Sequence, residues 1–300
     1  MENSKKKIII FSDLDGTLLD HKTYSYTDAK NALKKISDQK IPLILVSSKT
    51  SAEMLKIIDE LNQDGLKFNH PFICENGSAI YVPKNYFNFN IAKEISYQVK
   101  NRGKFKEIKI SDVNYQDLVK ILKKIEKNID AKIIGFNDLT AKQLSNECGL
   151  KLEDAKSAKT REFDEPFRID PDDPNLYQKI EKMILEKGLN YTKGGRYAHI
   201  MGRQDKGLAV KLLSKLFKKK YQNIKTIGFG DSKNDLEFLG ICDQGYLVSN
   251  PKKPTCPELV EWVDASIKSD KINRISEIGP KGFNKVVLKL ISNCFNYSNF

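Results

Sequence analysis

The chain has 300 residues, 40% of them hydrophobic and 30% charged, which suits one large or two ordinary globular domains. No segment approaches the roughly 20 apolar residues that cross a bilayer. The apolar run behind the basic start is also shorter than the apolar stretch of a secretory signal, which has about 7–15 residues. We therefore expect a cytoplasmic protein without a membrane partner. The net charge of +12 comes from lysines spread along the whole chain, which favours a solvated surface or a small anionic substrate over nucleic acid, because zinc-finger spacings and aromatic RNA-binding signatures are absent.

Cysteines and histidines are few and scattered. The five cysteines include no C-x-x-C pair, so we expect reduced thiols rather than zinc ligands or disulfides. With three histidines and no G-x-S-x-G elbow, a histidine-based or serine hydrolase is disfavoured.

The first part of the chain alternates short apolar runs with amphipathic stretches, a rhythm typical of a doubly wound sheet. In chain order we expect a strand over 7–12, a helix over 27–39, a strand over 42–47, a helix over 52–61, and strands over 71–74 and 79–82. The apolar runs are fit for buried parallel strands.

From about residue 84 to residue 201 the chain becomes more polar and lysine-rich. Here we expect helices over 117–128, 140–148 and 175–187, strands over 132–136, 161–169 and 197–201, and turns at 170–174 and 193–195. The first rhythm then resumes, with helices over 207–217 and 234–239 and strands over 226–229 and 244–248. The sequence therefore predicts an α/β fold: a doubly wound, Rossmann-like parallel-sheet core over 1–83 and 202–300, with an α+β domain inserted over 84–201.

Two acids follow the first predicted strand. Asp13 and Asp15 are two residues apart, so on an extended chain both carboxylates point the same way. One can act as a nucleophile and the other as an acid–base for the leaving oxygen, while Gly16 permits a sharp turn. A calcium-binding loop is excluded, because Leu18 and Tyr24 stand where it needs a glycine and an acid.

Two further stretches offer contacts for a phosphate. Ser47, Ser48 and Lys49 end the second predicted strand, where hydroxyl and N–H groups suit a phosphate oxygen. Taken alone, a serine pair in this place is usually a helix cap. Lys206 opens a predicted helix, where its charge opposes the helix dipole, so it either neutralises a phosphate or extends into solvent. The stretch lacks the lysine and hydroxyl of a P-loop.

Asp231 and Asp235 follow the predicted strand over 226–229. A carboxylate at a strand tip is a natural ligand for a hard cation, so we assign Asp231 to a metal site, together with Asp235, which can hold the ligands in place. A dinucleotide fingerprint is excluded, because Lys233 stands where its third glycine belongs.

Together these motifs supply a nucleophile, an acid–base, a hydroxyl, a lysine and a metal-binding carboxylate. They meet if the predicted strands are parallel, because ligands bind at the carboxyl edge of an open α/β sheet. An aspartate approaches a dianionic phosphate only when cations offset the repulsion. The sequence therefore predicts Mg²⁺ as the cofactor at this edge.

In this order the four motifs resemble those of the haloacid dehalogenase (HAD) superfamily of phosphatases, and the inserted domain resembles the larger cap of that superfamily. The resemblance covers essentially the whole chain. It implies that Asp13 is the nucleophile and Asp15 the general acid–base, and that Ser47 and Lys206 bind the phosphate. It also implies Mg²⁺ ligation by Asp13, by the carbonyl of Asp15 and by Asp231.

Further stretches resemble one family within that superfamily, the mannosyl-3-phosphoglycerate phosphatases, which release mannosylglycerate. They are SSKT at 47–50, PFICENG at 71–77, REFDEPF at 161–167, GGRY at 194–197 and GPKGFN at 279–284. Ser47 replaces the usual threonine and keeps its hydroxyl, and Phe283 stands where tryptophan is expected. The resemblance implies a small anionic sugar-phosphate substrate, a glycosyl-3-phosphoglycerate.

Residues for such a substrate follow from the same stretches. The predicted substrate-binding residues are Ser48, Lys49, Asn76, Arg161, Glu162 and Arg196. A glycerate carboxylate needs basic partners such as Lys49, Arg161 and Arg196, with structural salt bridges as the alternative for each. Glu162 and Asp164 either accept sugar hydroxyls or pair with nearby lysines.

Two other functions stay open. One keeps the chemistry and changes the substrate, to glucosyl-3-phosphoglycerate, sucrose phosphate or a hexose phosphate; a substrate panel ranked by kcat/KM distinguishes these. The other is a non-catalytic basic binding protein, which is disfavoured because every catalytic position holds a competent residue.

Overall fold

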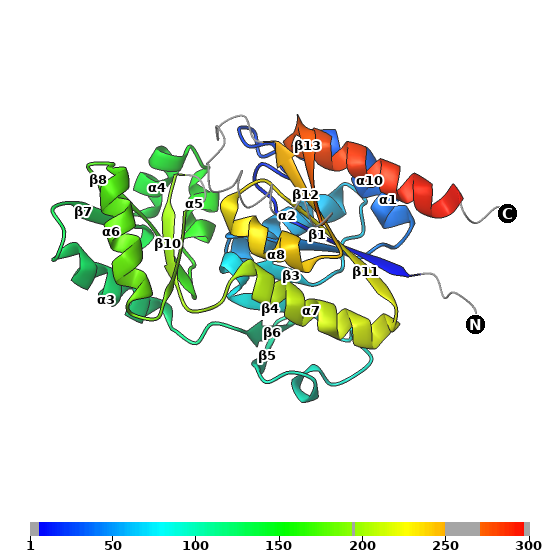
Figure 1. The fold of residues 1–300 in the computed structure, drawn as a ribbon, viewed down its shortest axis with the longest axis horizontal. Coiled ribbons are helices and arrows are strands. Elements are labelled where there is room, and N and C mark those ends of the chain that lie inside the picture. Colours follow the sequence, from blue (N-terminus) through cyan, green and yellow to red (C-terminus); the bar gives the residue numbers. More distant parts are fainter. Residues whose placement is uncertain (1–5, 194–195, 250–270, 297–300) are drawn as a thin grey trace.

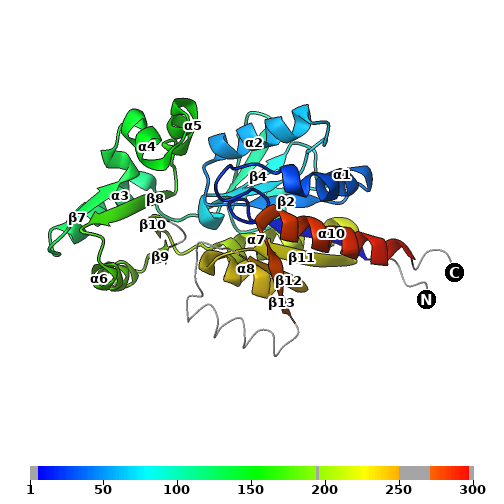
Figure 2. The same ribbon diagram turned by 90° about the horizontal axis from the view of Figure 1, so that it is seen from above.

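The computed structural model describes residues 6–193, 196–249 and 271–296, the last three by their backbone alone. The strands of this part of the chain form two sheets, which Figures 1 and 2 show in two lobes side by side. We call them the core lobe (residues 6–109, 202–249 and 271–296) and the cap lobe (residues 110–193 and 196–201). The glycines at 194–195 of the predicted turn, and Cys256, lie outside the described residues.

The core lobe is built on a sheet with the strand order β13-β12-β11-β1-β2-β3-β4-β6-β5 in the described residues. Its strands are β1 (Lys7–Ser12), β2 (Leu43–Val46), β3 (Phe72–Cys74), β4 (Ala79–Pro83), β5 (Gln98–Arg102), β6 (Phe105–Lys109), β11 (Ile224–Gly230), β12 (Gln244–Ser249) and β13 (Ile272–Ile278). Neighbouring strands from β13 to β3 are parallel, and β4, β6 and β5 continue the sheet antiparallel. The predicted doubly wound α/β fold is confirmed.

Helices cover both faces of this sheet (Figure 2). They are α1 (Lys30–Asp38), α2 (Ser51–Gln63) and α10 (Gly279–Asn296) on one face, and α7 (Lys206–Tyr221) and α8 (Leu236–Ile241) on the other. Because successive side chains of a strand point to opposite faces, Ile10 packs with the first group of helices while Ile9 and Phe11 pack with the second. Burial on both faces explains why these strands are apolar throughout.

The cap lobe has a smaller sheet of antiparallel neighbours, in the order β7-β8-β10-β9. Its elements are α3 (Tyr115–Glu126), β7 (Lys132–Gly135), α4 (Ala141–Cys148), α5 (Leu152–Ala158), β8 (Asp164–Asp170), α6 (Pro174–Leu185), β9 (Asn190–Lys193) and β10 (Ala198–Met201). The apolar sides of α3 and α6 share one core with this sheet, and α4 and α5 pack around Phe136.

Two strands lie beyond the predicted domain boundary at residue 83. β5 and β6 fall in the range 84–201 that was expected to form the inserted domain, yet they pair with β4 in the core sheet. Because most of β5 is exposed, its sequence lacks the alternation of apolar and polar residues that indicates a strand. We therefore propose that the cap begins after Lys109.

Four further elements, α5, β9, β13 and α10, were not expected from the sequence. In α10 the buried residues Phe283, Val287 and Ile291 recur every four positions, a helical spacing that the sequence does carry. β9 has no such pattern and forms because it pairs with β10. Across the residues that the structure describes, no helix has both the length and the hydropathy needed to cross a bilayer.

Candidate active site

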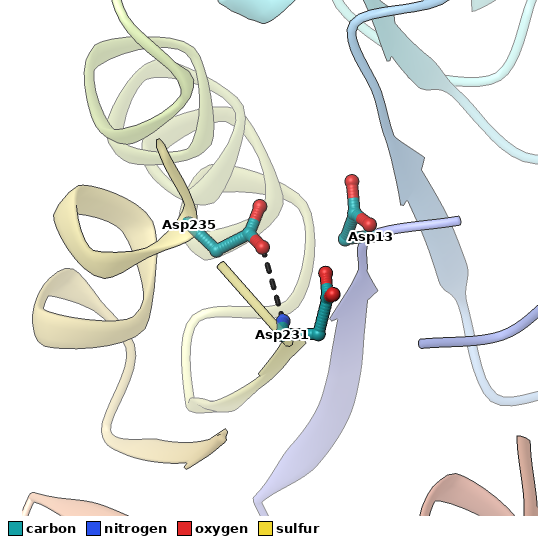
Figure 3. Close-up of side chains that lie close together, drawn as sticks. All are labelled: Asp13, Asp231 and Asp235. Carbon is teal, nitrogen blue, oxygen red and sulfur yellow. Dashed lines mark hydrogen bonds between the residues drawn. The ribbon is translucent and has the colours of Figure 1, made fainter. Parts of the chain in front are cut away.

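Two of the predicted motifs meet at the carboxyl edge of the core sheet. Asp13 follows β1 and Asp231 follows β11, and these strands are paired, with Ser12 opposite Phe229. The N–H of Asp13 donates to the carbonyl of Phe229 at 2.9 Å, so strand pairing itself positions the acid. Figure 3 shows Asp13, Asp231 and Asp235 together, and each offers a carboxylate oxygen within 4.8 Å of the others.

Lys206 completes this cluster from the first residue of α7. Its Nζ lies 2.7 Å from Oδ1 of Asp13 and 2.7 Å from Oδ1 of Asp235, and its side chain is buried. Asp205 caps the helix by accepting a hydrogen bond from the N–H of Leu208 at 2.7 Å, which offsets the unfavourable position of a lysine at a helix start. Lys206 therefore does not extend into solvent, and 193 residues of sequence separate it from the aspartate that it contacts.

Asp235 holds the loop that carries Asp231. One oxygen of Asp235 accepts the bond from Lys206. The other accepts hydrogen bonds from the backbone N–H groups of Asp231 and Ser232, each at 3.0 Å, and Figure 3 draws the bond from Asp231. Both oxygens are thus engaged with protein groups. This arrangement suits a residue that positions the metal-binding loop.

The electrostatics of the cluster favour a bound cation. Burial, and next the charge of Asp235, raise the pKa of Asp13 well above its usual value, and Lys206 opposes this rise. Burial alone would lower the pKa of Lys206, but Asp13 and Asp235 reverse this effect and raise it. Three carboxylate groups converge in a buried site, and Mg²⁺ prefers such oxygen ligands. The residues present therefore fit a magnesium ion.

Asp15 lies beside the cluster and pairs with Lys49. The distance from Lys49 Nζ to Asp15 Oδ2 is 2.7 Å, and Lys49 also lies over the ring of Tyr24, 5.2 Å from its centroid. The other oxygen of Asp15 is buried and has no hydrogen-bond partner in the structure. A buried carboxylate oxygen without a partner is costly unless a ligand contacts it.

The second motif forms the tight turn between β2 and α2. Ser47 is buried, and its hydroxyl accepts a hydrogen bond from the N–H of Lys49 at 3.2 Å. Thr50 caps α2 through a reciprocal pair of hydrogen bonds with Glu53, a capping box. Cap formation thus falls to Thr50, which leaves Ser48 and Lys49 at the surface of the cleft.

A cleft of about 1740 Å³ lies between the lobes above this cluster. Its core wall includes Asp13, Asp15, Lys49, Lys206 and Asp231, and its cap wall includes Phe136, Arg161, Arg196, Tyr197 and His199. The cleft therefore gives a ligand access to both lobes at once.

A buried polar network joins the lobes at this cleft. Arg161 donates to the carbonyl of Ser48 at 2.7 Å and to Oδ1 of Asp164 at 2.5 Å. Asn76 and His199 both contact Oδ2 of Asp164, at 2.8 and 3.1 Å. Burial alone would raise the pKa of Asp164, but Arg161 and then His199 more than reverse this, so it is lowered. The predicted substrate residues Asn76 and Arg161 thus lie in the cleft, where each already forms hydrogen bonds with protein groups.

The other two predicted cap residues have different surroundings. Glu162 forms a salt bridge with Arg102 at 2.7 Å, with both side chains well exposed, and does not line the cleft. Arg196 lines the cleft and donates to the backbone carbonyl of Glu147. Of this pair, only Arg196 is placed to meet a ligand.

The sequence reasoning missed the role of one turn, Glu75–Gly77. All three residues have positive φ, 44°, 54° and 91°, and only the Asn-Gly pair signals such a turn. The Glu75 carboxylate accepts hydrogen bonds from the N–H groups of residues 162–164. A Cβ on Gly77 would lie 2.1 Å from the carbonyl oxygen of Asp205. The turn thus packs against the cap on one side and against the residue before Lys206 on the other.

Comparison with known proteins agrees with this geometry. The family model described as haloacid dehalogenase-like hydrolase matches residues 10–270. The chain is 42% identical over 285 residues to a protein of Methanococcoides burtonii named glucosyl-3-phosphoglycerate/mannosyl-3-phosphoglycerate phosphatase, covering 95% of this chain and 97% of that protein. It is 31% identical over 242 residues to the mannosyl-3-phosphoglycerate phosphatase of Pyrococcus furiosus, covering 81% and 91%.

Solved structures share the fold at low sequence identity. The sucrose-phosphatase of Synechocystis, in complex with sucrose and phosphate, superposes with a TM-score of 0.59 at 15% identity, over 96% of this chain and 98% of that one. The SMU.1108c protein of Streptococcus mutans gives 0.62 at 18% identity, over 96% and 99%. With the family match, these likenesses place the chain: it belongs to the haloacid dehalogenase-like hydrolases and is one of their phosphatases.

Proposed function

We propose that this protein is a magnesium-dependent phosphatase that hydrolyses glucosyl- and mannosyl-3-phosphoglycerate through an aspartyl-phosphate intermediate. The observation that carries the proposal is the contact of Lys206 with Asp13 at 2.7 Å, in one buried cluster with Asp231. The names of the relatives at 42% and 31% identity support the substrate class. The first of these names includes both sugars, so we expect little discrimination between them.

Asp13 and Asp15 divide the chemistry. An oxygen of Asp13 attacks phosphorus, the bond to the glyceryl oxygen breaks, and Asp15 in its acid form protonates that oxygen. Asp15 then takes a proton from the water that attacks the aspartyl phosphate, which releases phosphate and restores Asp13. The short separation of the two acids along the chain allows both to reach one phosphate.

Lys206 and the metal site offset charge on the phosphate. The Lys206 ammonium binds a phosphate oxygen while it keeps Asp13 in place, and the Ser47–Lys49 turn offers hydroxyl and N–H groups to the others. Asp13, Asp231 and the carbonyl of Asp15 would hold Mg²⁺, with Asp235 supporting their loop. When bound, the ion reduces the repulsion between the nucleophile and the dianionic phosphate.

The test is phosphate release from a substrate panel in the presence of Mg²⁺. We expect kcat/KM for the two glycosyl-3-phosphoglycerates to exceed that for sucrose phosphate and free hexose phosphates by about a hundredfold or more. A higher kcat/KM for a hexose phosphate or sucrose phosphate would replace the proposed substrate. Absence of phosphate release from every ester would favour a binding protein instead.

A further inference from the structure

We propose that His199 binds the carboxylate of a phosphoglycerate ligand in the cleft, and that Asp164 positions it for this contact. The inference rests on the proposed function, from which the phosphoglycerate is taken. It concerns a residue that the sequence motifs did not single out.

His199 is a polar residue in an otherwise apolar strand. Its neighbours in β10, Ala198 and Ile200, are fully buried in the cap core, whereas His199 lines the cleft with 12% of its side chain exposed. An imidazole at this position contributes nothing to the apolar core that the rest of the strand builds. Its side chain belongs to the wall that faces the catalytic cluster.

The orientation of the imidazole follows from its contact with Asp164. Nδ1 lies 3.1 Å from Oδ2 of Asp164, whose side chain is fully buried. A carboxylate acceptor keeps a proton on Nδ1 and fixes the ring, so Nε2 is the nitrogen left for a ligand. Among the described residues, no hydrogen bond to Nε2 is formed.

Arg161, the more obvious carboxylate ligand, already donates to protein groups through two of its three nitrogens. Its Nε donates to the carbonyl of Ala158 at 3.2 Å and its Nη1 donates to Ser48 and Asp164. These bonds tie the cap to the turn that carries the second motif. Arg161 therefore balances the charge of Asp164. This leaves the ring of His199, on the other oxygen of Asp164, as a basic group that faces the cleft.

Short contacts link His199 to the phosphate end of the cleft. Asn76 lies 3.4 Å from Nδ1 of His199, and Asn234 donates to Oδ1 of Asn76 at 3.3 Å. Asn234 belongs to the same short turn as Asp235. In 3-phosphoglycerate two carbons separate the carboxylate from the phosphate ester oxygen, so a residue that binds the carboxylate must lie near the phosphate site. The contacts through Asn76 and Asn234 place His199 on that side of the cleft.

The test compares the affinities of 3-phosphoglycerate and glycerol 3-phosphate, which differ by the carboxylate. Calorimetry uses the full chain loaded with Mg²⁺ and carrying Asp13→Asn, so that neither ligand is hydrolysed. We expect 3-phosphoglycerate to bind about tenfold or more tightly than glycerol 3-phosphate, since a hydrogen bond to a charged carboxylate is worth that much.

Two substitutions separate ligand contact from a structural role. His199→Asn retains a donor to Asp164 at the place of Nδ1 and removes Nε2, so the preference for 3-phosphoglycerate should be lost while glycerol 3-phosphate binds within about twofold of the parent. His199→Gln retains a donor near Nε2 and should preserve part of the preference. His70→Asn, outside the cleft, is the matched control and should leave the ratio of the two affinities unchanged.

The inference is overturned by any of three results: no preference in the parent, full preference in His199→Asn, or equal loss of both ligands in that variant with a lowered melting temperature. Because no glycosyl ester is used, these results are independent of the substrate panel. Suppose that the substrate panel shows a preference for another sugar phosphate, while His199→Asn still removes the preference for 3-phosphoglycerate in calorimetry. The proposed substrate would then be refuted and the carboxylate site would be retained.

Discussion

At the scale of single residues, the candidate site depends on buried charged side chains that stabilise one another by pairing. Asp13, Lys206 and Asp235 are all nearly or fully buried, and a buried charge persists only when it is paired. Lys206 contacts two carboxylates at once. The same pairing therefore holds the proposed nucleophile, Asp13, beside the ammonium that we propose binds the phosphate.

Asp13→Asn should abolish turnover and leave the fold intact. The amide keeps the shape of the side chain and an oxygen for Lys206, but it is not a nucleophile, so kcat should fall by at least about a thousandfold. The melting temperature should stay the same or rise, because one of the crowded negative charges is removed. Phosphate-release assays and thermal melts measure the two effects.

A matched control is Asp38→Asn, at the exposed end of α1, which should alter neither value. Residual activity of Asp13→Asn within about tenfold of the parent would contradict the nucleophile assignment.

At the scale of elements, the turn Glu75–Gly77 organises the site although it carries none of the catalytic groups. The N–H of Asn76 donates to the carbonyl of Ser47 at 3.1 Å, and the N–H of Glu75 donates to that of Lys49 at 2.9 Å. The next residue, Ser78, accepts from Ile110 and Ser111 at 2.9 and 3.0 Å, where the chain enters the cap. One turn with three left-handed residues thus connects the turn at residues 47–49, the start of α7 and a connection to the cap.

Gly77→Ala should displace the start of α7. The new Cβ would lie 2.1 Å from Asp205 O and 2.9 Å from Lys206 N, so the helix start must move, which costs about 1–3 kcal/mol of stability. Because Lys206 moves with it, kcat/KM should fall by about tenfold or more. Chemical unfolding and steady-state kinetics measure these effects.

Gly103→Ala provides the comparison, because Gly103 also has a positive φ, 55°, but its Cβ would meet nothing within 4 Å. Only the backbone strain of about 1–2 kcal/mol should appear there, without a change in kcat/KM. Equal kinetic effects in the two variants would show that the close contact at Gly77 does not position Lys206.

At the scale of the whole molecule, a metal bound to the acid cluster links parts of the chain that are distant in sequence. Asp13 follows β1 and Asp231 follows β11, so the two residues are far apart in the sequence although their strands are neighbours in the sheet. A ligand that binds only the folded state stabilises it. Occupancy of this site should therefore be visible in the stability of the entire protein.

Mg²⁺ should raise the melting temperature in the absence of substrate. At a hundredfold excess over its dissociation constant the gain in stability is about 2.7 kcal/mol, and EDTA should remove both this gain and the phosphatase activity. Differential scanning calorimetry measures the first effect and phosphate release the second. In Asp231→Asn the shift should largely disappear; an undiminished shift there, or full activity after dialysis against EDTA, would place the metal elsewhere.

The sequence by itself determined the catalytic edge of the sheet. An apolar run such as Ile8–Phe11 fits a strand that helices cover on both faces of the sheet. Parallel strands then bring the residues that follow them to one edge of that sheet. For this reason the predicted strands indicated that Asp13, Lys206 and Asp231 would meet, and the contacts in the structure agree.

Only the tertiary structure decided where the cap begins and which polar groups of the cleft are free. β5 is held by pairing with β6 rather than by its own apolar pattern, so no local signal marks it as part of the core. Likewise Arg161 is a candidate in the sequence and His199 is not, because the shared partner Asp164 comes between them only after folding. Hydrogen bonds between residues remote in sequence produce no periodic pattern, so they cannot be predicted from the sequence.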